Sequence, residues 1–192
     1  SPSIPATVDL TGSAAANAVA IYQAGNKTYA VVARASSSNP ELYVIDITNP
    51  SLPVVTSTLE LGADANDIAI AGNYAVVASS HDDQELQVID LSNPTLPAVV
   101  SSLDLSGSAN AFSVMATGTV VFIGRNSSSQ PEVYSVSIAT PSAPVLLDLS
   151  PLELGSDVTK MTLAPNSQYL YVVSPGNSLE LSVILVSDPS NL

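Results

Sequence analysis

A short proline-containing motif recurs along this chain, and its spacing constrains the fold more than any other feature of the sequence. The first prolines of five copies lie at positions 2, 50, 94, 141 and 189, which gives separations of 48, 44, 47 and 48 residues. The three clearest copies begin at Asn49, Asn93 and Thr140, and shorter versions lie at both ends. A period of about 40 to 50 residues is typical of propellers and solenoids. The chain is therefore expected to contain four copies of one structural unit.

The segments between the motifs predict four short β-strands in each unit. In the second unit, residues 67–71, 74–78, 85–91 and 96–105 are apolar or alternating runs rich in Val, Ile and Leu, bounded by Gly, Asn, Pro or Ser. Gly72 and Asn73 separate the first two runs at the length of a hairpin turn. Because Pro has no N–H to donate to a sheet, the motif is expected to connect the third strand to the fourth. The corresponding segments elsewhere are residues 18–22, 111–115 and 159–163 for the first strand, 29–33, 120–124 and 169–173 for the second, and 42–47, 133–138 and 181–186 for the third.

The repeat predicts an all-β fold, a β-propeller of four four-stranded blades around a central axis. Residues 1–192 are interpreted as one domain with repeats at approximately 6–53, 54–97, 98–144 and 145–192. Both ends fall inside the motif, so residues 6–10 are expected to complete the last blade and close the ring. The same number of repeats also suits half of a larger propeller, completed by a second chain, or a piece of a longer array. A sandwich or a β-solenoid fits this period less well.

Two copies of the motif carry a longer signature. Residues 44–50 read Val, Ile, Asp, Ile, Thr, Asn, Pro, and residues 88–94 read Val, Ile, Asp, Leu, Ser, Asn, Pro. This pattern resembles the LVIVD-type repeat family. The third copy departs from it at Ser137 and Thr140, and the fourth at Leu185 and Asp188. The resemblance implies a β-propeller, commonly on secreted or cell-surface proteins of bacteria and archaea, with no shared catalytic machinery.

The polar residues of these two motifs are interpreted as structural. Asp side chains near turns often accept hydrogen bonds from the backbone N–H groups that follow them. Six residues are assigned to the turns in this way: Asp46, Asn49, Pro50, Asp90, Asn93 and Pro94.

The charge of the chain restricts its partners. Four Lys and Arg residues stand against 17 Asp and Glu residues, a formal net charge of −13, with no basic stripe. Nucleic acid and anionic lipid are therefore poor partners, whereas a protein or glycan at a cell surface, or a cation, is compatible with this charge. No apolar run is long enough to span a membrane, and the absence of Cys leaves the redox compartment open. Ser1 is not preceded by Met or an apolar leader, which indicates a processed or shortened product.

One group of residues is a candidate metal site. His81, Asp82 and Asp83 are adjacent in the loop between the second and third strands of the second unit, and Asp64 and Asp67 lead into its first strand. In a propeller these two regions share a face, so the five side chains are predicted to converge near the mouth of the channel. Carboxylate oxygens suit a hard cation, and calcium is the one cofactor that the sequence suggests. Ordinary turn and capping roles for these Asp residues are the alternative.

The sequence offers little support for catalysis. It has one His, no Cys, no Gly-x-Ser-x-Gly nucleophile motif and no phosphate-binding glycine loop. The chain is therefore predicted to be a non-enzymatic extracellular or cell-surface β-propeller for adhesion or protein interaction. Two alternatives stay open. One is the globular part of a surface filament or pilin-like subunit, which involves self-association, and the other is a calcium- or glycan-binding module.

Overall fold

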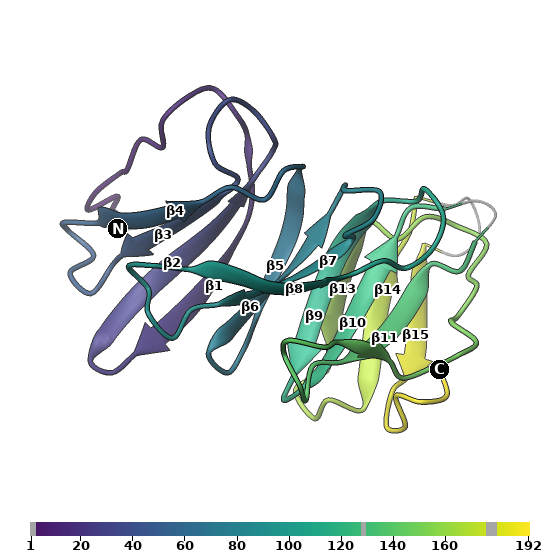
Figure 1. Ribbon diagram of the computed structural model, residues 1–192. Coiled ribbons are helices and arrows are strands. Elements are labelled where there is room, and N and C mark those ends of the chain that lie inside the picture. Colours follow the sequence, from purple (N-terminus) through teal and green to yellow (C-terminus); the bar gives the residue numbers. More distant parts are fainter. Residues whose placement is uncertain (1–2, 128–129, 176–179) are drawn as a thin grey trace.

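The computed structural model describes residues 3–127, 130–175 and 180–192 (Figure 1). The regular secondary structure of this part of the chain consists of β-strands, which form four antiparallel sheets in chain order. The described residues contain no helix long and apolar enough to cross a membrane. The predicted all-β architecture is confirmed.

Each sheet is one blade, and its strands pair in chain order. Blade 1 contains β1 (Ala16–Ala24), β2 (Lys27–Arg34), β3 (Leu42–Asp46) and β4 (Val54–Leu59). Blade 2 contains β5 (Ala65–Ala71), β6 (Tyr74–Ser79), β7 (Leu86–Asp90) and β8 (Ala98–Leu103). Blade 3 contains β9 (Ala111–Thr117), β10 (Val120–Arg125), β11 (Val133–Ser137) and β12 (Val145–Leu146). Blade 4 has three strands among the described residues: β13 (Lys160–Leu163), β14 (Tyr169–Val173) and β15 (Leu181–Leu185).

The connections follow from the residues that form them. Gly25, Gly72 and Gly118 have φ of 61°, 61° and 59° in the hairpins between first and second strands, a conformation that Gly adopts without steric cost. The proline motifs connect third to fourth strands at residues 47–53, 91–97 and 138–144, as predicted. The blades are therefore offset from the sequence repeats by one strand, because the strand after each motif belongs to the preceding sheet.

The blades stand side by side in an arc. Their inner strands contact one another in the order β1, β5, β9, β13, and Figure 1 shows the two chain ends at opposite ends of this row. Within the described residues, 6–10 form no strand and do not pair with β15, so the predicted closure of the ring by this segment is not found. The segment before β1 is instead held on blade 1, because the Arg34 guanidinium donates hydrogen bonds to the carbonyl oxygens of Thr11 and Ala14 at 2.9 and 3.0 Å.

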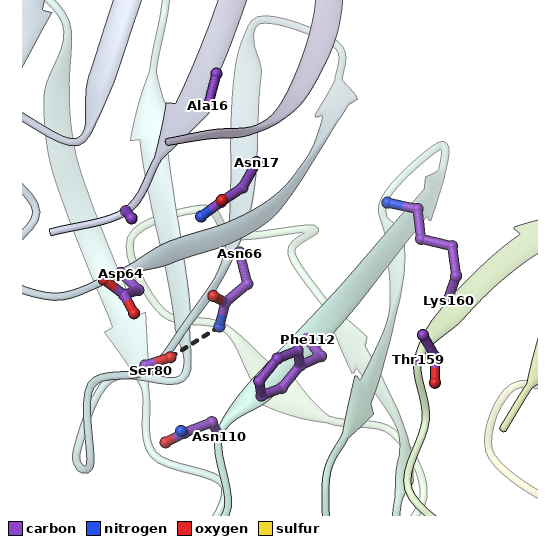
Figure 2. Close-up of a pocket in the computed structure, with 10 residues that line it drawn as sticks. Ala16, Asn17, Asp64, Asn66, Ser80, Asn110, Phe112, Thr159 and Lys160 are labelled. Atoms are coloured by element: carbon purple, nitrogen blue, oxygen red, sulfur yellow. Dashed lines mark hydrogen bonds between the residues drawn. The ribbon is translucent and has the colours of Figure 1, made fainter. Parts of the chain in front are cut away.

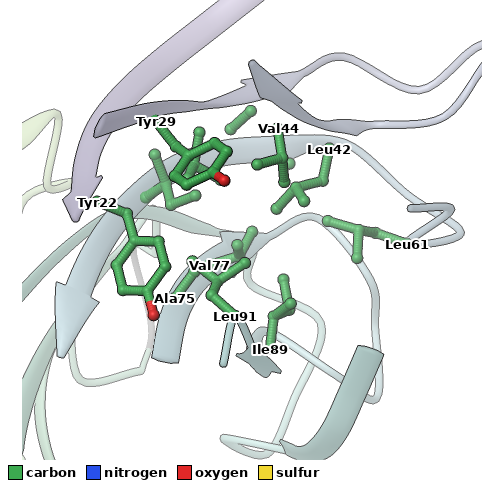
Figure 3. Close-up of a cluster of buried hydrophobic side chains, with 13 residues drawn as sticks. Tyr22, Tyr29, Leu42, Val44, Leu61, Ala75, Val77, Ile89 and Leu91 are labelled. Carbon is green, nitrogen blue, oxygen red and sulfur yellow. The ribbon is translucent and has the colours of Figure 1, made fainter. Parts of the chain in front are cut away.

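Apolar side chains fill the space between neighbouring blades. Figure 3 shows the cluster between blades 1 and 2, where Tyr29 and Val44 face Val77 and Ile89. Similar clusters fill the next two junctions. At the third junction a Cβ on Gly124 would collide with the Val158 side chain, so glycine permits the close approach there. Burial between blades is thus the main apolar contribution to stability, as expected for stacked repeats.

A buried Glu side chain links each of the first three blades to the next one. The residue before each third strand accepts a hydrogen bond from a backbone N–H in the following inter-blade linker. The pairs are Glu41 with Leu61 at 2.8 Å, Glu85 with Leu105 at 3.1 Å, and Glu132 with Leu154 at 2.6 Å. Desolvation by burial raises the pKa of Glu85 and of Glu132.

The proline motifs also join neighbouring blades. A Ser hydroxyl of one blade donates a hydrogen bond to the carbonyl oxygen of the first motif proline of the next blade. The three pairs are Ser57 with Pro94 at 2.6 Å, Ser101 with Pro141 at 2.5 Å, and Ser135 with Pro189 at 2.5 Å. The recurring motif is thus both a turn within a blade and a contact between blades.

Candidate functional site

A polar pocket of about 570 Å³ lies where the inner strands begin (Figure 2). All four blades contribute to it, because each inner strand starts on the same side of the arc. Its main side chains are Asn17 from blade 1, Asp64, Asn66 and Ser80 from blade 2, Asn110 and Phe112 from blade 3, and Thr159 and Lys160 from blade 4. The pocket is therefore the place where a ligand contacts the whole row of blades.

Two amide side chains at equivalent positions shape the pocket. The Asn17 amide donates to the Ala65 carbonyl oxygen at 2.9 Å, and the Asn66 amide donates to the Ala111 carbonyl oxygen at 2.7 Å. Asn66 also donates to the Ser80 hydroxyl at 2.8 Å. Each amide thus reaches from its own inner strand to the next one, which holds the pocket wall in place.

Phe112 occupies the equivalent position in blade 3 and is 37% exposed. In Figure 2 its ring lies between the Asn66 and Lys160 side chains. An exposed aromatic ring surrounded by amides and hydroxyls offers an apolar surface together with directed hydrogen-bond groups. This combination is typical of binding pockets.

A hydrogen-bonded network below the pocket joins blades 2, 3 and 4. The buried Asp67 carboxylate accepts hydrogen bonds from the Ser113 hydroxyl at 3.0 Å and the Val114 N–H at 2.9 Å, and it pairs with the Lys160 ammonium at 2.6 Å. The Ser113 hydroxyl in turn accepts the Met161 N–H at 3.0 Å. Asp67 therefore has neighbours on two other blades, which indicates a structural role in fixing the inner strands.

The structure does not bring the five candidate metal ligands together. Within residues 3–127, 130–175 and 180–192, no three His, Asp or Glu side chains lie close enough to hold a metal ion. Asp82 and Asp83 are exposed, and His81 Nδ1 accepts the Asp83 N–H at 3.3 Å. Asp64 accepts the Ser36 N–H at 2.6 Å, and Asp67 belongs to the network described above. The described residues do not show the expected convergence, because Asp64 and Asp67 are bonded to residues of neighbouring blades whereas Asp82 and Asp83 are exposed.

The motif residues lie in turns. Asp46 accepts the Thr48 N–H at 3.0 Å, and Asp90 accepts the Ser92 N–H at 2.7 Å. The Asn49 and Asn93 side chains likewise accept the N–H groups two residues later, at 3.1 and 3.2 Å, directly beside Pro50 and Pro94. The hydrogen bonds from Lys27 and Thr48 hold the pKa of Asp46 at about 2.

Sequence reasoning missed Phe112 and the two amides as pocket residues. Asn17 and Asn66 share a place in the repeat, one residue before the segment predicted as the inner strand, which is a signal that aligned repeats contain. Phe112 replaces an amide at that place, and an isolated Phe in an apolar strand is read as a core residue. Only the geometry shows that its ring faces the pocket.

Comparison with known proteins supports the fold and the repeat. The LVIVD repeat model matches residues 16–59 and 62–105, which are blade 1 and blade 2 with its flanking linkers. No curated protein matches the sequence.

Three solved structures illustrate the likeness in fold. The computationally designed Ika4 protein has a TM-score of 0.59 at 13% identity, over 92% of this chain and 95% of that one. A protein from Lactobacillus plantarum has a TM-score of 0.70 at 13% identity, over 87% of this chain and 50% of that one. A protein from Bacteroides uniformis provisionally assigned as a 6-phosphogluconolactonase has a TM-score of 0.70 at 16% identity, over 90% of this chain and 54% of that one. The chain thus spans about half the length of these two bacterial proteins.

The last of these comparisons corrects one expectation from the sequence. A protein without enzymatic activity was expected because familiar catalytic motifs are missing. The likeness to a provisionally assigned 6-phosphogluconolactonase shows that this fold does not exclude an enzyme. At 16% identity the likeness concerns the fold alone, and it assigns no activity.

The resemblance in the proline motifs is confirmed by the two matched repeats. The third and fourth blades repeat the same strand order with weaker motifs. The chain therefore has a propeller-like all-β fold, and its first two blades match the LVIVD repeat model.

Proposed function

We propose that this chain forms part of an extracellular or cell-surface β-propeller that mediates adhesion or protein interaction. The LVIVD-type repeats and the net charge of −13 on an exterior poor in Lys support this role. The partner binds on the face that carries the polar pocket. Loops and strand ends at the channel mouth are a common place for recognition, because a rigid scaffold positions them.

The observation that carries the proposal is the exposed Phe112 ring within a pocket lined by all four blades. Its ring supplies the apolar contact, the Asn66 amide oxygen supplies an acceptor, and the Asn110 amide supplies both donors and an acceptor. Aromatic residues often dominate binding energy when they are covered by a partner. A surface loop of a partner protein would cover Phe112 in this way.

A neutral glycan is the second candidate ligand, because the pocket combines one aromatic ring with amides and hydroxyls. A sugar presents the complementary set, with apolar ring faces and many hydroxyl groups. Calcium is a weaker candidate, because Asp67 is engaged with Lys160, and Asp64 with the backbone of Ser36. The surface-filament alternative concerns assembly of the chain and is compatible with either ligand.

To test adhesion, beads coated with the chain are incubated with prokaryotic and with eukaryotic cells, and the bound beads are counted. Binding of the chain to a panel of neutral cell-surface oligosaccharides is measured in parallel. Phe112→Ala is expected to weaken binding about tenfold or more, since loss of an aromatic anchor commonly costs over ~1.4 kcal/mol. Phe112→Tyr keeps the ring and should retain binding. The control Leu96→Ala lies in the proline motif of blade 2, outside the pocket, and should bind as the unmodified chain does.

The two candidates give different results in this experiment. Binding to cells without binding to oligosaccharides indicates a protein partner, and binding to both indicates a glycan. If Phe112→Ala binds as well as the unmodified chain, the pocket is not the recognition site. The proposal fails altogether if the coated beads bind neither cells nor oligosaccharides.

A further inference from the structure

Among the described residues, blade 1 has an apolar outer face that stays exposed over the inner strand, with Val8 and Leu10 beside it. Val19 and Ile21 of β1 are 61% and 56% exposed. The sheet registers place Val19 at the same position as Val114 of blade 3, which is 1% exposed because blade 2 packs on it. The outer face of blade 1 is thus the side on which a preceding blade would pack.

Blade 4 has the complementary outer face. Leu181 and Val183 of β15 are 60% and 57% exposed. Their equivalents in blade 2, Leu86 and Val88, are fully buried against blade 3. Three further side chains of the same face are partly exposed: Tyr169, Tyr171 and Val173. The outer face of blade 4 is thus the side on which a following blade would pack.

The blades alternate in type, so one internal junction shows how the two outer faces would fit. Arg34 of blade 1 and Arg125 of blade 3 are equivalent buried residues, stacked 4.9 and 5.3 Å from the Tyr43 and Tyr134 rings. Blades 2 and 4 carry Ser79 and Ser174 at this place. A junction from blade 4 to blade 1 would therefore join a Ser-type blade to an Arg-type blade, as the internal junction from blade 2 to blade 3 does.

The two outer faces carry a Glu carboxylate and a linker N–H that correspond to groups hydrogen-bonded to each other in that internal junction. There, Glu85 of blade 2 accepts the Leu105 N–H and lies 3.8 Å from Arg125 Nη2. Glu180 is the equivalent of Glu85, and it is exposed. Leu10 is the equivalent of Leu105, with a glycine of φ near 83° two residues later in both linkers, and its N–H has no partner in the described structure.

The likeness to longer propeller-like chains supports a ring of about twice the length of this chain. The chain superposes on about half of each of the two bacterial propeller-like chains, with TM-scores of 0.70. Two half-rings related by a two-fold axis would form two identical junctions, each joining blade 4 of one copy to blade 1 of the other. Both outer faces of both copies would then be covered.

We propose that two copies of this chain associate head to tail into one closed eight-blade ring. Glu180 of each copy binds the Leu10 N–H of the other and faces its Arg34, as Glu85 does with Leu105 and Arg125. A contact between two different faces of the same chain closes into a ring only if the rotation is correct, and otherwise produces filaments. A ring of about twice the length of this chain is completed by two copies, which favours the closed dimer over a filament.

The solution mass of the chain tests the proposal. Light scattering coupled to size-exclusion chromatography should give twice the 19.6 kDa chain mass. Ile21→Glu on blade 1 and Val183→Glu on blade 4 should each give monomers, since either change places a charge in both junctions of a homodimer. Leu96→Glu, a matched charge at a site 74% exposed and away from both faces, should stay dimeric. Circular dichroism on each variant verifies that the fold is intact.

Mixing the two monomeric variants identifies the faces that meet. Ile21→Glu keeps an intact blade 4 face and Val183→Glu an intact blade 1 face, so an equimolar mixture should form a heterodimer with one undamaged junction. A dimer that persists in either variant alone shows contact between like faces and overturns the proposal. A monomeric unmodified chain, or a filament, also overturns it.

Discussion

The junction between blades 2 and 3 and the junction between blades 3 and 4 place the same repeat position in opposite electrostatic surroundings. Glu85 faces the buried Arg125, whereas Glu132 lies beside the carboxyl group of Glu153. Both nevertheless accept a backbone N–H from the linker that follows. The difference indicates that the backbone hydrogen bond is the shared requirement of a junction, and that a buried cation is an addition to it.

The largest effect is expected from removing that cation. Arg125 is fully buried and donates to the carbonyl oxygens of Leu105, Ser106 and Ala109. Arg125→Met leaves these carbonyl oxygens without the guanidinium donors and the buried Glu85 carboxylate without its cation. Breaking a buried pair in this way commonly costs about 3–5 kcal/mol, which urea unfolding at pH 7 would measure.

Arg34→Met is the matched control, because Arg34 has the same place and a similar stacking contact in blade 1. It donates to two carbonyl oxygens and has no carboxylate partner within the described chain. With both variants made in the monomeric Ile21→Glu background, where no Glu180 of a second copy faces Arg34, the loss for Arg34→Met should be smaller, about 1–3 kcal/mol. Equal losses for the two variants would mean that Glu85 contributes nothing to the difference between them.

An intermediate effect is expected at the hydrogen bonds between Ser hydroxyls and the proline motifs. The junction between blades 2 and 3 uses Ser101 of the fourth strand, and the next junction uses Ser135 of the third strand. Either Ser→Ala substitution should lower the free energy of unfolding by about 1 kcal/mol. The exposed neighbour Ser102 serves as control, and a similar loss in Ser102→Ala would contradict a role for the specific hydrogen bond.

The repeat predicted the fold well because its signals are local. Hairpin glycines, β-forming runs and prolines without an N–H each restrict only a few residues, so strands and turns could be placed from the sequence. The Glu that precedes each third strand, at positions 41, 85, 132 and 180, was equally visible but has a buried role that depends on the next blade. Ring closure by residues 6–10 and convergence of the five candidate metal ligands are not seen among the described residues, and both depend on how distant segments meet.

The pocket shows the same limit. Phe112 lies between Ala111 and Val114, which are buried, and nothing in the local pattern separates it from them. It lies where the pairing of β9 with β10 shifts register, between Ala111 and Ser113. A side chain that faces a shared cavity can be recognised only when all the blades that line the cavity are in place.

The smallest effect is expected from the carboxyl pair of the junction between blades 3 and 4. Burial, followed by the hydrogen bond with Glu153, raises the pKa of Glu132 above its usual value of 4.5. A carboxyl whose pKa is raised on folding binds more protons in the folded state. Its contribution to stability is therefore fully present below about pH 4.5 and is lost as the pH rises through the folded-state pKa. The lowered pKa values of Asp46 and Asp188 affect stability only below about pH 4, outside this range.

Urea unfolding at pH 5 and pH 7 should accordingly show a higher midpoint at pH 5. Glu132→Gln replaces the carboxylate by a neutral amide that can still accept the Leu154 N–H and can donate to Glu153, so it should raise the midpoint at pH 7 and reduce the difference between the two pH values. The exposed Asp9→Asn controls for the general loss of negative charge. If Glu132→Gln and Asp9→Asn leave the same pH dependence, the two junctions do not differ electrostatically in the way their carboxylates indicate.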